Sequence, residues 1–190
     1  IRASSFENLG IAEITIPDSV VVIGKSAFSN CRSLKKVNIN FSSKLERIED
    51  DAFRNTPIEN INFPSGLTYV GDFAFYKCLN LTTVDNQSND ITFGYQSFSH
   101  SSIKKINFPK NSIFHESSFK FCKKLKQLSF LEEPEKIIFG DESFAFTSLD
   151  KIKIKFTANI LSNAFIFCQS MKSVNINESV SFCNSSFSYS

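Results

Sequence analysis

Apolar and polar positions alternate in a short phrase of the form L-x-x-I-x-I that recurs along the whole chain. Its fourth position is apolar in every copy, and its third and fifth positions are polar. Alternation with a period of two is typical of a strand with one buried face. We therefore predict a strand at Ile11–Ile16, Leu34–Ile39, Ile58–Phe63, Leu81–Asn86, Ile103–Phe108, Leu125–Phe130, Leu149–Ile154 and Met171–Ile176.

An Ala-Phe or Ser-Phe pair marks one point of each repeat, and successive pairs are 21 to 25 residues apart. A unit of this length cannot bury its own apolar face, so neighbouring units must stack on one another. We expect a solenoid whose strands lie side by side and parallel. The phenylalanines of the pairs are Phe6, Phe28, Phe53, Phe75, Phe98, Phe119, Phe144, Phe165 and Phe187.

A third phrase precedes the pair in most repeats, as in Leu67–Val70 followed by Gly71, and it predicts a short extended stretch and a turn on the opposite wall. We expect the glycine of this turn to permit a positive φ. The glycines are Gly24, Gly71, Gly94 and Gly140. Proline follows directly on three predicted strands and ends them, at Pro17, Pro64 and Pro109.

The composition fits a stack that reuses one ring, with 22 Phe, no Trp and one Met. A net charge of +2 argues against a dedicated nucleic-acid binder, which carries a concentrated basic footprint. No apolar run is long enough to span a membrane. The repeats run without a linker, so we expect a single domain over residues 1–190 with about eight repeats. Neither end resembles a polar capping repeat, so we expect a fragment of a longer chain.

Four cysteines follow alternate phenylalanines of the pairs by three residues, at Cys31, Cys78, Cys122 and Cys168. Successive copies would lie two coils apart, roughly 10 Å, whereas a disulfide needs Cα atoms within about 7 Å. No C-x-x-C occurs, and ligands strung along an axis do not converge on a metal. We expect four free, buried thiols and an exposed Cys183.

Segments such as IPDSVVVIGKSAFSNCRSLKKVNI and FPSGLTYVGDFAFYKCLNLTTV resemble the BspA-like, treponemal-type leucine-rich repeat family. The resemblance covers essentially the whole chain. It implies an α/β-type leucine-rich repeat: a right-handed solenoid with a parallel β-sheet on the concave face, short strands and turns on the convex side, and little helix. It also implies a cell-surface or secreted protein that adheres to host or matrix molecules, and it specifies no ligand. The chain departs from the pattern at Asn86, which takes an apolar position and puts the packing of that strand in question.

No motif points to catalysis or to a cofactor. Val22–Ser26 (VIGKS) lacks the first glycine of a phosphate-binding loop, because Ser19 stands there. His100 and His115 fall in different phrases of the repeat, and no G-x-S-x-G or H-E-x-x-H occurs. Asp85–Asp90 lacks the glycine and the bidentate glutamate of a calcium loop. We expect no catalytic residue, no metal and no cofactor, and therefore a protein that is not an enzyme.

Two features concern the surface. The acidic Glu132–Glu135 run sits in a longer repeat and predicts a solvated loop. Five sequons would accept glycans if a eukaryotic cell secreted the chain, at Asn40, Asn80, Asn86, Asn177 and Asn184. Chance alone generates several in a chain rich in Asn, Ser and Thr, so they support an extracellular location only weakly.

The strand phrase selects the side chains that leave the core toward the concave face, at its third and fifth positions. A rigid polar face loses little entropy on binding, which favours recognition, although any solvated sheet face also needs polar residues. The candidate partner-binding residues are Lys36, Asn38, Asn60, Asn62, Thr83, Asp85, Lys105, Asn107, Gln127, Ser129, Lys151, Lys153, Ser173 and Asn175.

Lysines gather in the later half of this face, opposed locally only by Asp150. They are Lys104, Lys105, Lys126, Lys151, Lys153 and Lys172. Such a surface suits an acidic protein or an anionic glycan as partner, and salt should weaken the binding. Two function classes remain: a cell-surface or secreted module for adhesion and ligand binding, and a cytoplasmic protein-interaction scaffold. Free thiols fit the second class slightly better, because oxidising compartments favour disulfides.

The position two residues after each repeat phenylalanine is polar in early repeats, for example at Asn30 and Asn55. Later copies carry Phe121, Phe146 and Phe167 at this position. Either these rings fold inward and thicken the core, or they form an apolar stripe on one flank that contacts a partner or a second copy.

Overall fold

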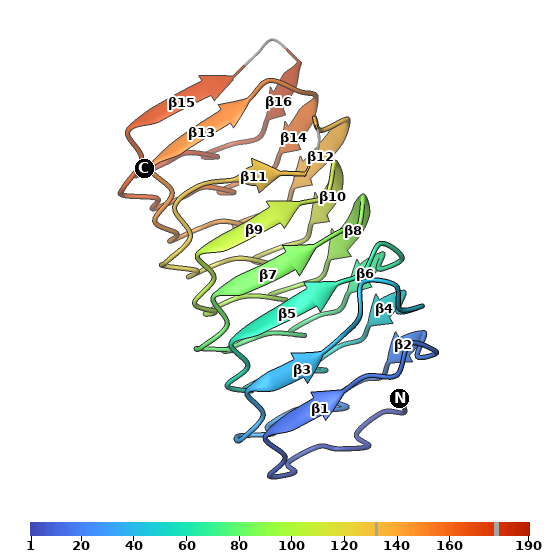
Figure 1. Cartoon of the computed structure of the whole chain (residues 1–190). Helices are drawn as coiled ribbons and strands as arrows, with labels where there is room; N and C mark the ends of the chain where they lie inside the picture. Colours follow the sequence, from blue (N-terminus) through green and yellow to red (C-terminus); the bar gives the residue numbers. More distant parts are fainter. Residues whose placement is uncertain (132, 177–178) are drawn as a thin grey trace.

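The computed structural model describes residues 1–131, 133–176 and 179–190, and the chain winds through them as a coil of stacked turns (Figure 1). Each complete turn gives one strand to a front sheet and one to a back sheet. No helix occurs in these residues. The predicted parallel-strand solenoid with little helix is confirmed, and turns connect its strands.

The front sheet follows the L-x-x-I-x-I phrase. Its strands are β1 (Glu13–Thr15), β3 (Lys36–Asn38), β5 (Asn60–Phe63), β7 (Thr83–Asn86), β9 (Lys105–Phe108), β11 (Ser129–Phe130), β13 (Lys151–Ile154) and β15 (Ser173–Ile176). β1, β3, β5, β7, β9 and β11 form one parallel sheet in this order. A bridge between Gln127 and Lys151 connects this sheet to the β13–β15 pair. Each of these strands lies inside a predicted segment.

The back sheet is continuous, whereas the sequence indicated short extended stretches in only some of the repeats. Its strands are β2 (Val22–Ile23), β4 (Arg47–Ile48), β6 (Tyr69–Val70), β8 (Asp90–Phe93), β10 (Asn111–Phe114), β12 (Lys136–Phe139), β14 (Ala158–Ile160) and β16 (Val180–Phe182). All of them pair in parallel in one uninterrupted sheet. The stretches that were predicted as short extended segments on the opposite wall are strands of this sheet, whereas β10, β14 and β16 were not predicted.

The core between the two sheets is built on a column of stacked rings. The phenylalanines of the Ala-Phe and Ser-Phe pairs stack in chain order, with centroids 5.1 Å apart between Phe6 and Phe28 and again between Phe165 and Phe187. A second stacked column on the back sheet joins Phe93 to Phe114 at 5.2 Å. Burial of such large side chains contributes most of the stabilising free energy.

Repeats of different length stack without loss of register. Phe28 and Phe53 are 25 residues apart, and Phe53 and Phe75 are 22 apart, yet their ring centroids lie 5.1 and 5.3 Å apart. The difference lies mainly in the turn from the front to the back sheet, which takes residues 39–46 after β3 but only 64–68 after β5. Insertions therefore change the turns and leave the sheets unchanged.

The expected role of the glycines is wrong. None of the glycines has a positive φ. They are required because a neighbouring coil comes close: a Cβ on Gly71 would lie 2.6 Å from the Asp50 nitrogen, and one on Gly24 would lie 2.7 Å from the Ala3 nitrogen. Positive φ values occur instead on the residues two before and two after each repeat phenylalanine, such as Ser26 and Asn30 around Phe28.

Asn86 fits its apolar position because its amide is fully used. Its Nδ2 donates to the carbonyl oxygens of Ser88 and Asn107, each at 3.1 Å, and its Oδ1 accepts from the Ser88 nitrogen at 3.0 Å. The side chain is only 7% exposed. These bonds satisfy the buried polar group and keep β7 in register.

Candidate ligand-binding surface

The front sheet arranges its polar side chains in two columns, as the phrase predicted. Glu13, Lys36, Asn60, Thr83 and Lys105 pair in register along the third position. The ladder continues from Gln127 to Lys151 and then to Ser173. Neighbours in a column lie on adjacent strands, roughly 4.8 Å apart, so a ligand that spans several turns can contact several of them.

The early half of the front sheet neutralises its own charge. The Lys36 ammonium lies 2.8 Å from a Glu13 carboxylate oxygen, and Asn38 donates to the same oxygen at 2.8 Å. These two hydrogen bonds, with that from Lys36 the larger cause, lower the pKa of Glu13. Both groups are exposed, so the pair adds little stability. It leaves Lys35 as the one lysine of the four early strand phrases without an ion pair to a described residue, and the same phrases carry the acidic Glu59 and Asp85.

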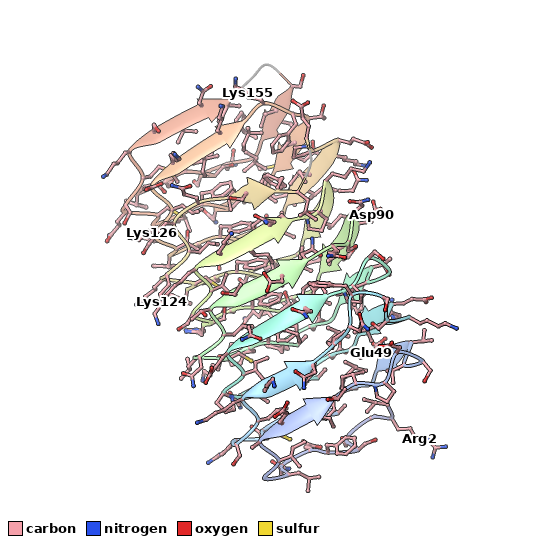
Figure 2. The ribbon with its side chains drawn as sticks, in the orientation of Figure 1. Arg2, Glu49, Asp90, Lys124, Lys126 and Lys155 are labelled. Carbon is pink, nitrogen blue, oxygen red and sulfur yellow. The ribbon has the colours of Figure 1, made fainter. Side chains whose placement is uncertain are left out.

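The later half keeps its positive charge. Lys104, Lys105, Lys126, Lys151, Lys153 and Lys172 form no ion pair with any carboxylate in the described part of the chain. Lys124 and Lys126 project at the edge where the chain enters the front sheet, whereas Lys155 lies beyond the far end of β13 (Figure 2). Lys104, Lys105 and Lys126 line one hollow of about 290 Å³ together with Gln127 and Ser129. Unpaired ammonium groups beside amide and hydroxyl groups are suited to carboxylate or sulfate oxygens.

The flank between the back sheet and the front sheet carries a ladder of stacked rings. His100, Phe121, Phe146, Phe167 and Tyr189 occupy the same position of successive turns. Their centroids are separated by 4.6, 4.7, 4.8 and 4.9 Å in that order. We call these five residues the aromatic ladder. In the earlier turns the same position carries Asn30 and Asn55, whose side-chain amides hydrogen-bond at 2.9 Å.

The aromatic ladder belongs to the surface and not to the core. Its rings are partly exposed, and Tyr189 is 75% exposed. Each residue has a left-handed backbone, with φ between 56° and 61°. Of the two alternatives for these rings, inward folding into the core is wrong, because the rings stack along the flank and stay partly exposed. The contact role of Phe121, Phe146 and Phe167 stays a prediction.

The cysteines are placed as predicted. All five are free, four of them are buried, and Cys183 is exposed. The Cys78 Sγ donates to the Phe53 carbonyl oxygen at 3.1 Å, and Thr56 fills the equivalent position one turn earlier. Burial raises the pKa of Cys78 and of Cys122 to about 12, so both thiols stay protonated at neutral pH.

Several surface features carry no charge pattern that selects a ligand. A hollow of about 290 Å³ on the back sheet is lined by one described carboxylate, Asp90, and one lysine, Lys136, so its charges balance. Glu133 and Glu135 are exposed, as the predicted solvated loop requires, and Glu132 lies outside the described residues. VIGKS forms β2 and a turn.

The sequons differ in their exposure. Asn40, Asn80 and Asn184 are exposed, and Asn177 lies outside the described residues. The amide of Asn86 is buried and hydrogen-bonded, so the folded chain cannot accept a glycan there.

Among residues 1–131, 133–176 and 179–190, His, Cys, Asp and Glu side chains form no cluster of three or more that could hold a metal ion. The same residues include no helix long and apolar enough to cross a membrane.

Two parts of this surface were missed from the sequence. Tyr189 extends the aromatic ladder, and aligning it two residues after Phe187 would have revealed it. His100 was aligned at this position only as a polar residue, yet its ring stacks on Phe121. Burial, then the charges of Lys77, Lys123 and Lys120, lower the pKa of His100.

These features define a repeat protein: a parallel-strand β-solenoid in which every turn repeats one leucine-rich phrase. The chain matches the family described as BspA type Leucine rich repeat region (6 copies), over residues 1–126 and 111–190, and it belongs to that family. The resemblance seen in the sequence is thereby confirmed. Leucine-rich repeat solenoids are, as a class, protein-interaction modules with extended binding surfaces.

Solved structures show the same fold. A leucine-rich repeat protein from Bacteroides ovatus matches with a TM-score of 0.61 at 23% identity, over 95% of this chain and 65% of that chain. A leucine rich cell surface protein from Faecalibacterium prausnitzii matches with a TM-score of 0.51 at 18% identity, again over 95% and 65%. This chain therefore spans 65% of the length of these two structures. No curated protein matches it in sequence.

Proposed function

We propose that this chain is a non-enzymatic ligand-binding module at a cell surface, and that it binds acidic proteins or anionic glycans through the later half of its front sheet. The observation that carries the proposal is the set of unpaired lysines on strands that are held in register. Because the sheet is rigid, these ammonium groups are preorganised, and binding loses little conformational entropy.

Location at a cell surface is supported by family membership and by the fold shared with a leucine rich cell surface protein. The alternative is an intracellular scaffold, which the free thiols favoured. The structure weakens that argument, because the four repeat cysteines are buried in separate turns and their state does not report on the compartment. Protease treatment of intact source cells separates the two: a surface module is cleaved, whereas an internal scaffold is protected.

The binding proposal is tested on immobilised panels of extracellular proteins and glycans, with the native chain and a Lys105→Ser, Lys151→Ser, Lys153→Ser variant. The three side chains are exposed, so the variant should fold. We expect the native chain to select acidic members of the panel, with an affinity that falls as salt rises. Equal binding of acidic and neutral members, or equal binding by the variant, would contradict the proposal.

A further inference from the structure

Three hollows that share lining residues lie next to one another at the corner between the aromatic ladder and the front sheet. The first, of about 420 Å³, is walled by Phe146 and Phe167. The second, of about 440 Å³, shares Ser148, Gln169 and Ser170 with the first and reaches Lys126 and Lys172. The third shares Lys126 and adds Lys104 and Lys105. We call these three hollows together the corner groove.

The corner groove is strongly positive. Five lysines line it, and Asp150 is its one described carboxylate. None of the five is in an ion pair with another described residue. The lysines are Lys104, Lys105, Lys123, Lys126 and Lys172. Charge complementarity therefore favours a ligand with several negative charges along its length.

The two rings at the other end of the groove occupy a costly backbone position. A bulky residue in the left-handed region is an outlier, whereas asparagine adopts it readily. The same position carries Asn30 and Asn55 in turns outside the groove. Phe146 and Phe167 therefore give this end of the groove an apolar wall, which Asn at the same position would not provide.

The stacking decides which ligand fits. A sugar or a nucleic-acid base binds by stacking on the face of a ring, but both faces of Phe146 and of Phe167 are covered by their neighbours in the aromatic ladder. Only ring edges remain, and these carry the positive end of the quadrupole. An apolar side chain of a ligand can pack against these ring edges, and carboxylates next to it in the ligand can reach the lysines of the groove. Gln169 and Ser170 are exposed. Their side chains form no hydrogen bond with another described residue, so they are available to a peptide backbone.

We propose that the corner groove binds an acidic peptide segment of a partner protein. An apolar side chain of the peptide lies against Phe146 and Phe167, and its carboxylates contact Lys126 and Lys172. This inference rests on the proposed binding function and names the class of partner.

A displayed library of random peptides, selected on the native chain, tests the proposal. We expect enriched peptides that combine Asp or Glu with a neighbouring apolar residue. Synthetic copies should bind a Phe146→Asn, Phe167→Asn variant at least about tenfold more weakly, and a Lys126→Ser, Lys172→Ser variant likewise. Matched controls at the same repeat positions outside the groove, Lys77→Asn and Lys35→Ser, should stay within about twofold.

If the Phe146→Asn, Phe167→Asn variant has a lowered melting temperature, the Lys126→Ser, Lys172→Ser variant still tests the proposal. Failure to enrich acidic peptides, or unchanged binding by the lysine variant, overturns the proposal. A sulfated oligosaccharide that binds the groove in place of the peptides overturns it too. If the peptides lose affinity only for a Lys151→Ser, Lys153→Ser variant, whose two lysines lie outside the groove, front-sheet binding stands and the corner groove is rejected.

Discussion

The rings of Phe119 and Phe144 are 25 residues apart in the chain, yet they stack with centroids 5.2 Å apart and only 2° between their planes. A longer connecting turn has not displaced either ring. The column of repeat phenylalanines therefore sets the spacing of the turns, while the turns absorb differences in length.

Substitutions at two neighbouring phenylalanines should separate the core from the aromatic ladder. Phe144→Ala removes a fully buried ring and should cost about 3–5 kcal/mol of unfolding free energy. Phe146→Asn loses two stacks of about 0.5–1.5 kcal/mol each, and Asn relieves about 1 kcal/mol of left-handed strain, so the net loss should stay below about 2 kcal/mol.

Denaturant titration of both variants measures this difference. The Phe121→Asn, Phe146→Asn, Phe167→Asn variant should remain folded and lose any association seen by light scattering. A loss at Phe146 as large as that at Phe144 would place the aromatic ladder in the core.

The repeat pattern was sufficient to predict the front-sheet strands and their register, because register depends on a period that the sequence shows directly. The pairing of Lys36 with Asn60 and of Lys151 with Ser173 follows from aligning one phrase. The glycine role was not predictable in the same way, because the clash of a Gly71 Cβ is with Asp50 of another turn. The corner groove also depends on contacts between turns, which a repeat pattern does not show.

Gly71→Ala and Gly66→Ala form a matched pair that tests this explanation of the glycines. The Gly71 Cβ would lie 2.6 Å from backbone, whereas the nearest atom to the Gly66 Cβ is 3.6 Å away. We expect Gly71→Ala to destabilise the chain by about 1–3 kcal/mol. Gly66→Ala should be neutral or stabilise it by up to about 1 kcal/mol, since alanine restricts the unfolded chain. Equal melting temperatures for the two variants would show that close approach is not the reason for glycine.

Thiol reactivity tests the placement of the repeat cysteines. Unfolded, unreduced protein should release five titratable thiols, because all five are free. In the native protein Cys183 should react first, while Cys78 and Cys122 should react slowest, since both are buried and their pKa is raised to about 12. Peptide mapping after brief maleimide treatment identifies the labelled residues. A disulfide between any two of the four repeat cysteines would refute the register.

His100 should make stability depend on pH. Its pKa is lowered in the folded chain, first by burial and then by nearby lysines, so the unfolded chain binds the proton more readily. Stability should therefore be full above the ordinary histidine pKa of about 6.5 and should fall as the pH drops below it. His100→Asn should remove this part of the pH dependence. Denaturant unfolding of both proteins between neutral and mildly acidic pH measures the difference, and parallel curves would contradict the assignment.

The proposed binding of anionic partners by the later half of the front sheet is tested most directly by paired charge variants. The late variant is Lys105→Ser, Lys151→Ser, Lys153→Ser, and the early variant is Lys35→Ser, Lys36→Ser, Lys44→Ser. Both change the net charge equally. Their affinities for immobilised heparin and polyglutamate are compared with that of the native chain over a range of salt. We predict that the late variant binds at least about tenfold more weakly and the early variant changes less than about threefold. Equal losses in both variants would show that net charge alone attracts these ligands and would contradict a site on the later strands.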